Sequence, residues 1–146
     1  MLRPAALRFR DENAARRWLE ETIWPTGPVC PHCEVRGKIY KLRSKEQTKH
    51  KLREGIYKCG ECRKMFTVRV GTIFQGSHVP IHKWLLAIEL IDSCVGGRIS
   101  ARQIMRTLQL GSYRTAWLMT RRIRAMLMMA NRRLEEGLRE WFRYDV

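Results

Sequence analysis

The stretches Cys30-Pro31-His32-Cys33 and Cys59-Gly60-Glu61-Cys62 each place two thiols on a tight turn, within reach of one ion. Four such sulfurs complete a closed tetrahedral shell, which is typical of structural zinc. The 25 residues that separate the pairs exceed the usual spacing of ~15–20, and the excess indicates an inserted hairpin. We therefore predict a single structural Zn²⁺ ion ligated by Cys30, Cys33, Cys59 and Cys62.

Two redox pairs or buried free thiols are the alternatives to this metal site. A redox Cys-x-x-Cys opens a helix after a strand, and neither pair has that context. His32 lies inside the first pair and is expected to be a bystander, while Cys94 falls on the apolar side of a predicted helix and is expected in the core. A shell of four protein ligands leaves no open position for water, so the predicted site is not catalytic.

The charge of the chain indicates a polyanionic partner. Its 146 residues carry 29 Lys and Arg against 14 Asp and Glu, a net charge of +15. A membrane is the least favoured partner, because the longest apolar runs, 84–88 and 125–130, fall far below the ~20 residues needed to span one. The N-terminal residues lack an apolar signal core, so we expect a cytoplasmic, nucleoid-associated bacterial protein.

The sequence divides into three parts and predicts an α+β fold. Residues 1–28 hold a basic arm and a helix that Asp11 caps and that runs to about Ile23. Residues 29–76 alternate turns with short strand-like pieces at 38–42, 55–58 and 64–70, as a small zinc ribbon would. Residues 77–146 read as a helical domain with a long C-terminal helix.

The helical part contains a helix-turn-helix pattern at about residues 100–124. Pro80 opens a first apolar helix, and Ser100 caps a short second helix with Ile104 and Leu108 inward. A turn at 110–112 leads to a third helix that starts at Ser112. We expect one inward stripe on it, formed by Trp117, Thr120, Ile123, Leu127 and Ala130.

The arginines of this region point to DNA. Residues 98–133 contain nine arginines and no acid, whereas a merely solvated helix normally mixes both signs. Arginine suits both phosphate neutralisation and bidentate contact with guanine. The residues expected to contact base edges or phosphate at the start of the third helix are Ser112, Tyr113, Arg114 and Thr115. Backbone contacts are expected from Arg102, Arg106, Arg121, Arg122 and Arg124, although solvated side chains remain the alternative for each arginine.

The predicted hairpin between the cysteine pairs forms a second basic surface. Its cations are Lys41, Arg43, Lys45, Lys49, Lys51 and Arg53. Such a ribbon would clamp a backbone or enter a groove, and an exposed loop made soluble by its charge is the alternative interpretation.

The order of these motifs resembles the N-terminal region of bacterial insertion-sequence transposases, which precedes a catalytic domain of RNase H-like fold. The matching pieces run from about Asn13 to Met126 and comprise Trp24-Pro25, both cysteine pairs, Tyr57-Lys58, Phe66-Thr67-Val68, Gly71-Thr72-Ile73-Phe74, 77–84, Ser100-Ala101-Arg102-Gln103 and Tyr113-Arg114-Thr115-Ala116-Trp117. The resemblance implies a zinc ribbon and a helix-turn-helix that recognise terminal inverted repeats. None of the acids, such as Asp11, Asp92 and Asp145, matches the family's catalytic positions, so the resemblance implies no enzyme activity here.

We therefore expect a sequence-specific double-stranded DNA-binding protein, a transcription regulator domesticated from a transposase. The alternative is a truncated transposase fragment that binds inverted repeats without catalysing transposition. A protein adaptor that contacts RNA polymerase or another transcription protein is a third hypothesis. The apolar run Met126 to Met129, with Trp141 and Phe142, indicates a homodimer as a further possibility.

Overall fold

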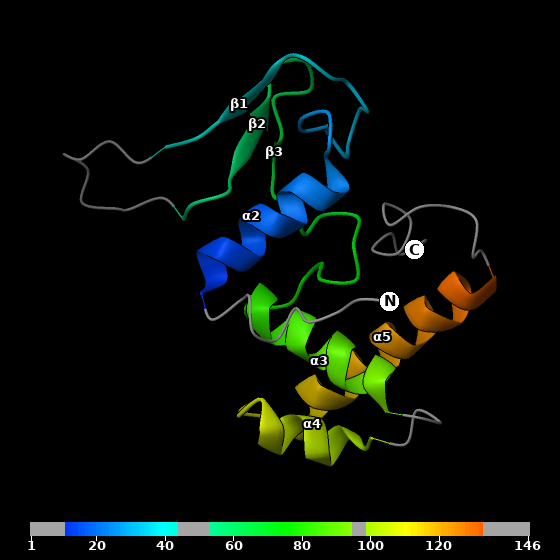
Figure 1. Cartoon of the computed structure of the whole chain (residues 1–146). Helices are drawn as coiled ribbons and strands as arrows, with labels where there is room; N and C mark the ends of the chain where they lie inside the picture. Colours follow the sequence, from blue (N-terminus) through cyan, green and yellow to red (C-terminus); the bar gives the residue numbers. More distant parts are fainter. Residues whose placement is uncertain (1–10, 44–52, 95–98, 133–146) are drawn as a thin grey trace.

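The computed structural model describes residues 11–43, 53–94 and 99–132 of the chain. Four helices and a small three-stranded sheet form an α+β fold, as the sequence predicted. The sheet and the cysteine turns lie at one end, α2 (Glu12–Ile23) lies beneath them, and the remaining helices form the other end (Figure 1). The predicted basic arm, the turn at Gly96 and Gly97, and the tail after Arg132 lie outside the described residues.

The sheet is antiparallel, with β2 in the centre. β1 (Ile39–Lys41) pairs with β2 (Tyr57–Cys59), and β2 pairs with β3 (Met65–Phe66). The third strand is much shorter than the predicted segment 64–70. It ends at Phe66 because the next residues close turns instead, in which the Val70 amide donates to the Thr67 carbonyl and the Thr72 amide to the Arg69 carbonyl.

Helix α2 begins where the sequence predicted, because the Asp11 carboxylate accepts a hydrogen bond from the Ala14 amide at 3.3 Å. Its buried residues Ala15 and Leu19 face the helical core, against which α3 also packs. Glu20, one residue further, is buried against the ribbon, where its Oε2 accepts a 2.9 Å hydrogen bond from the Tyr57 hydroxyl. Helix α2 therefore connects the two ends of the molecule.

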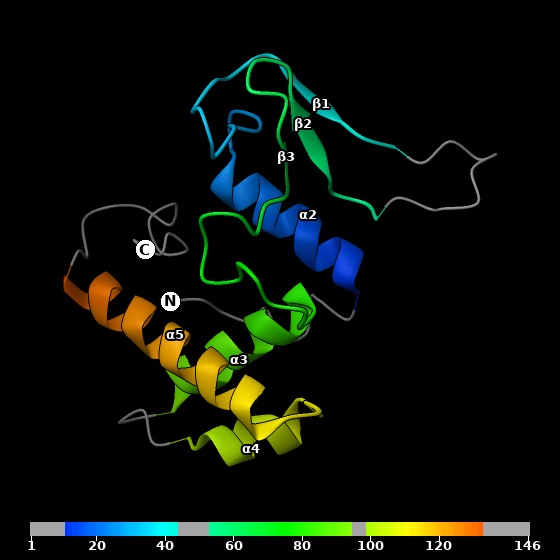
Figure 2. The ribbon, with the colours of Figure 1, turned by 180° about the vertical axis from the view of Figure 1, so that it is seen from behind.

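Helices α3 (Ile81–Ser93), α4 (Ala101–Thr107) and α5 (Tyr113–Arg132) pack together at the lower end. Pro80 precedes α3 and Ser100 caps α4, both as predicted, and Gln103 completes a reciprocal capping box with Ser100. A turn joins α4 to α5, and in Figure 2 α5 crosses in front of α3 with its first turns beside α4.

One buried cluster joins all four helices with the loop that leaves the ribbon. Trp84 and Phe74 are its largest members, and their ring centroids lie 5.3 Å apart at 81°. The inward stripe of α5 is Ala116, Met119, Thr120, Ile123 and Met126. The prediction that Trp117 faces inward was wrong: its side chain is 44% exposed, since the buried stripe is centred one residue earlier on this turn.

A second, smaller cluster surrounds the cysteines. Tyr57 and Phe66 stack with their ring centroids 5.8 Å apart, and Trp24 meets both rings edge-on. Trp24 also packs against the helical cluster, so one side chain touches both cores.

Candidate metal centre and nucleic-acid interface

The two cysteine turns have matching backbone geometry. The Cys30 amide donates to the Val35 carbonyl at 3.2 Å, and the Cys59 amide donates to the Lys64 carbonyl at 3.0 Å, in each case five residues on. The residue after the second cysteine of each pair, Glu34 or Arg63, has a positive φ of 58° or 59°. This left-handed residue reverses the chain, so both sulfurs of each pair point to one centre.

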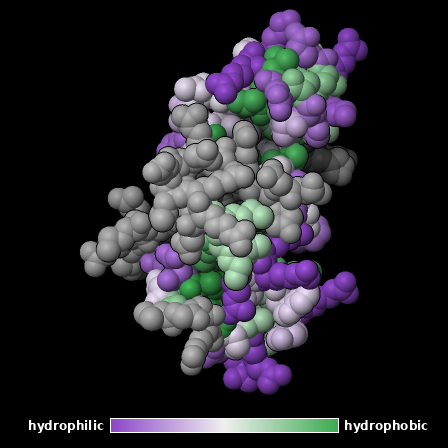
Figure 3. All heavy atoms as spheres, turned by 90° about the vertical axis from the view of Figure 1, so that its right-hand side faces the viewer, coloured by the Kyte–Doolittle hydropathy of each residue, from purple (hydrophilic) through white to green (hydrophobic). Residues whose placement is uncertain are grey.

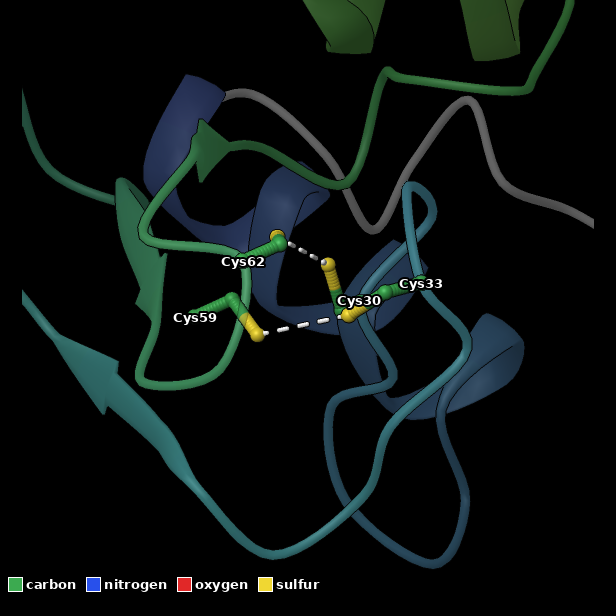
Figure 4. A group of neighbouring side chains, drawn as sticks. All are labelled: Cys30, Cys33, Cys59 and Cys62. Carbon is green, nitrogen blue, oxygen red and sulfur yellow. Dashed lines mark hydrogen bonds between the residues drawn. The ribbon is translucent and has the colours of Figure 1, made fainter.

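The four sulfurs converge from both turns, as Figure 4 shows. They lie within 4.8 Å of one another, with 3.6 Å between Cys30 and Cys62 and 3.6 Å between Cys33 and Cys59. A tetrahedral zinc ion with Zn–S bonds of ~2.3 Å requires sulfurs about 3.8 Å apart. The four cysteines therefore form a zinc-ribbon site suited to one structural Zn²⁺, as predicted, and His32 lies exposed outside it.

The surroundings of the four thiols shift the pKa values of Cys59 and Cys33 in opposite directions. A backbone hydrogen bond from Cys62, with a second from Glu61, lowers the pKa of Cys59 to about 7. At Cys33 a backbone hydrogen bond from Val35 acts in the lowering direction, but burial and the three neighbouring sulfurs outweigh it and raise the pKa to about 12. Crowded thiols disfavour further negative charge among themselves, whereas a bound zinc ion deprotonates its thiol ligands outright.

Contacts around the second turn hold it against the sheet. The Gly60 amide donates to the Lys38 carbonyl at 2.7 Å, and the Lys38 ammonium pairs with the Glu61 carboxylate. That ion pair raises the pKa of Lys38. These two contacts with Lys38 hold the second cysteine turn against the start of β1.

The part of the chain that holds the paired cysteine turns is similar to a known family. Residues 10–65 match the transposase zinc-ribbon domain. The match confirms the resemblance inferred from the sequence over the ribbon part, and the matched residues include α2, β1, β2 and all four cysteines.

The chain is also similar to an uncharacterized protein in transposable element ISH50 of Halobacterium salinarum. The two are 29% identical over 84 residues, which is 55% of this chain and 25% of that relative. The chain therefore matches about a quarter of the relative's length. No solved structure matches the chain.

Several of the side chains predicted to contact DNA lie exposed on α4 or near the start of α5. Ser112, Tyr113 and Arg114 are exposed, and Thr115 is half-buried. Arg102 and Arg106 are exposed on the adjacent α4, and Arg121 is exposed two turns further along α5. The fold therefore brings these residues of α4 and α5 to one end of the molecule.

Two of the predicted backbone-contacting arginines hold the protein's own main chain. Arg122 Nη1 donates to the carbonyls of Ile73 and Gln75 at 3.1 and 2.9 Å, and Arg124 Nη2 donates to the carbonyl of Ile99 at 2.7 Å. These bonds tie α5 to the loops before α3 and α4. The sequence pattern could not separate them from Arg114 or Arg121, because all four share one charge and one helix.

The basic ribbon surface is described only in part. Arg43 and Arg53 are exposed at the ends of the hairpin, while Lys45, Lys49 and Lys51 lie outside the described residues. Lys41 lies above the Tyr57 ring, 5.6 Å from its centroid, and its Nζ is 3.8 Å from a Glu20 carboxylate oxygen. Lys41 is therefore held between the sheet and α2.

An open groove of about 440 Å³ runs beside the first turns of α5. The loop 76–80, the start of α3 and the turn 109–112 form its walls, and none of its described lining residues is acidic. Lys83 and His78 line it together with Ser112 and Thr115. Sequence reasoning missed Lys83 and His78, because only the packing of α3 on α5 brings them near Ser112.

In Figure 3 hydrophilic residues predominate at both the ribbon end and the opposite helical end, with hydrophobic residues visible among them. Among the described residues, no helix combines the length and the apolar character needed to cross a membrane.

Proposed function

We propose that this protein binds double-stranded DNA sequence-specifically through a helix-turn-helix formed by α4 and α5, with the zinc ribbon as a second contact. The observation that carries the proposal is the exposed start of α5 beside α4, with exposed Arg102 and Arg106 on α4 and no acid in residues 99–132. The transposase zinc-ribbon match supports a role on DNA. A capped short helix, a turn and a longer exposed helix is the arrangement that places the second helix in the major groove.

In this proposal the residues divide their roles by position. Ser112, Tyr113, Arg114 and Thr115 meet base edges, because the N-terminal turns of a recognition helix approach the groove floor. Arg102, Arg106 and Arg121 neutralise flanking phosphates, and Lys83 in the groove adds a further phosphate contact. Arg122 and Arg124 remain candidate contacts to the DNA backbone, and the bonds that one Nη of each donates to carbonyls hold α5 in place.

The ribbon contributes a second, sequence-independent contact. Arg43 and Arg53 are exposed beyond β1 and before β2, and the sheet lies at the end opposite α4 (Figure 1), which fits a backbone clamp some distance from the major-groove contact. We keep the division into an arm with helix (1–28), a ribbon (29–76) and a helical domain (77–146) as part of this proposal, with α2 as their shared support.

The biological role that we propose is transcription regulation by a transposase-derived protein that does no chemistry itself. A regulator of this kind acts at the nucleoid in the cytoplasm, as a homodimer and in contact with RNA polymerase or another transcription protein. The exposed Met128 and Met129, late in α5, are the candidate dimer surface. Sedimentation of the zinc-loaded chain tests the dimer, and an unchanged monomer at high concentration would remove it.

A second candidate function is occupancy of insertion-sequence ends by a transposase fragment, which the ISH50 relative favours. Genome-wide occupancy in the native cell separates the two. Peaks that share a motif at a few promoters support the regulator, whereas peaks confined to insertion-sequence ends support the fragment.

Arg114→Ala tests the DNA-binding proposal itself. We expect this change to weaken binding to a selected site by roughly 1–3 kcal/mol and to leave binding to random duplex nearly unchanged, because a bidentate base contact is specific. Competition binding at one fixed salt concentration measures both affinities. Equal losses on both duplexes would show that Arg114 does not read bases.

A further inference from the structure

Three large apolar side chains lie exposed in the first two turns of α5. Tyr113 is 52% exposed, Trp117 is 44% exposed and Leu118 is 39% exposed. Tyr113 and Trp117 are four residues apart, so they lie one above the other on one side of the helix. Leu118 borders the groove beside them. An exposed tryptophan at this place is an energetic cost to the isolated protein, because its apolar ring remains in water.

Two arginines of α5 adjoin this apolar stripe of Tyr113, Trp117 and Leu118. The Arg121 guanidinium lies over the Trp117 ring, 5.5 Å from its centroid, and Arg114 follows Tyr113 directly. Among the described residues the neighbouring α4 adds Arg102 and Arg106, and no acid interrupts the set from 99 to 132. A partner that binds the stripe must therefore present an apolar group to these side chains and negative charges to the arginines beside them.

A second copy of the chain does not fit this description. A symmetric contact through the stripe would place Arg114 and Arg121 opposite their own copies, and like charges across an interface cost several kcal/mol. Duplex RNA does not fit either, because its narrow major groove does not admit a helix. The DNA major groove does, and the only apolar group on its base-pair edges is the C5 methyl of thymine.

We infer that the stripe of Tyr113 and Trp117 reads thymine methyl groups, so that the target site contains at least one thymine opposite the second turn of α5. This inference rests on the proposed function and deepens it. The Arg121–Trp117 stack presents the edge of the indole to the base while the guanidinium meets a flanking phosphate. Trp117 is thus a specificity residue, distinct from Arg114, which reads guanine.

The test uses the zinc-loaded full chain and the duplex that it selects from a random library. Each thymidine of that duplex is replaced in turn by deoxyuridine, which removes one methyl group and leaves base pairing unchanged. We expect about a fourfold loss of affinity at one or two positions, the effect of one buried methyl group. With Trp117→Ala we expect this loss to vanish at the position facing residue 117.

Two further variants test whether the loss of the deoxyuridine effect is specific to the Trp117 side chain. Met65→Ala removes another exposed apolar side chain, on β3 of the ribbon, and keeps the deoxyuridine effect if the inference holds. Trp117→Phe keeps an aromatic ring and retains part of the effect. Circular dichroism confirms that each variant is folded before its binding is compared.

The outcomes separate the inference from the proposed function. A selected duplex that is bound specifically but is insensitive to deoxyuridine at every position overturns the inference and leaves sequence-specific binding standing. The inference also fails if Trp117→Ala retains the full deoxyuridine effect, or if this variant dissociates a dimer without changing that effect. A library from which no duplex is enriched overturns the proposed function instead.

Discussion

The backbone conformation of single residues in the cysteine turns determines the geometry of the metal site. Glu34 and Arg63 adopt left-handed backbone so that each turn can aim two sulfurs at one centre. Gly60 lies so close to β1 that an added Cβ would be 3.1 Å from the Lys38 carbonyl oxygen and 3.2 Å from a ring carbon of Tyr40. The metal site is thus specified by backbone approach as well as by its four ligands.

Gly60→Ala is expected to destabilise the zinc-loaded protein by about 1–3 kcal/mol, because the new methyl group must push the turn away from β1. Urea unfolding measures the change. Gly111→Ala is the matched control, since nothing lies within 4 Å of a Cβ at that position. Equal stability of the two variants would show that the close approach at Gly60 carries no cost.

Cys59→Ser is expected to remove zinc and unfold the ribbon, because three remaining thiolates leave the tetrahedral shell incomplete and the aromatic cluster around it is small. Zinc content and thermal unfolding check this. Cys94→Ser, which changes the cysteine outside the site, should keep one zinc per chain. A Cys59→Ser protein with full zinc content and an unchanged melting curve would refute the ligand assignment.

At the scale of elements, one ion-pair network fixes the ribbon to the helices. Arg69, in the loop after β3, donates to the carbonyls of Ser77 and Val79 at 2.9 and 2.8 Å and pairs with Glu12 at 3.2 Å. The second Glu12 oxygen accepts from the His82 amide at the start of α3. Burial lowers the pKa of Arg69, and Glu12 opposes that shift. The network thus joins α2, the loop and α3.

Arg69→Met should destabilise the protein by roughly 1–3 kcal/mol, because two carbonyl acceptors and the Glu12 carboxylate lose a charged donor. Thermal unfolding of the zinc-loaded chain measures this loss. Arg17→Met changes an exposed arginine on α2 and should alter stability by less than ~0.5 kcal/mol. If the two variants have the same melting temperature, the Arg69 network does not stabilise the contact between α2, the loop and α3.

The sequence predicted the elements well and their contacts less well. The caps at Asp11 and Ser100 and the four ligands depend on local spacing, which a sequence displays. The exposure of Trp117 and the carbonyl contacts of Arg122 depend on how α5 rotates against α3 and the loop at Ile73. Packing between residues far apart in the chain decides this rotation. Periodicity alone therefore put Trp117 on the buried stripe, where the structure has the preceding residue, Ala116.

At the scale of the whole molecule, two buried clusters share one tryptophan. The larger cluster holds the helices together without any cysteine ligand, whereas the smaller cluster contains Cys30 and Cys59 themselves. Figures 1 and 2 show α2 between the two ends; Leu19 packs in the helical cluster and Glu20 accepts a hydrogen bond from Tyr57 of the ribbon. Loss of the metal should therefore unfold the ribbon end before the helical end.

Chelation of the zinc is expected to unfold residues 29–66 while most of the helical signal persists, because the helical cluster needs no metal. Far-ultraviolet circular dichroism and the near-ultraviolet signal of the ribbon aromatics, recorded before and after a chelator, separate the two ends. Complete loss of helix on chelation would show that the molecule is a single cooperative unit. Re-addition of zinc should restore the ribbon signal.

The central claim is that the first turns of α5 lie in the major groove of a DNA duplex. The most direct measurement is photo-crosslinking of the zinc-loaded full chain, with a photoreactive phenylalanine derivative at Tyr113, to its selected duplex. We predict crosslinks to bases within the selected motif, and none from the same group placed at Arg17 on α2. Crosslinks from position 17 with none from position 113, at a salt concentration where the duplex is bound, would contradict the account.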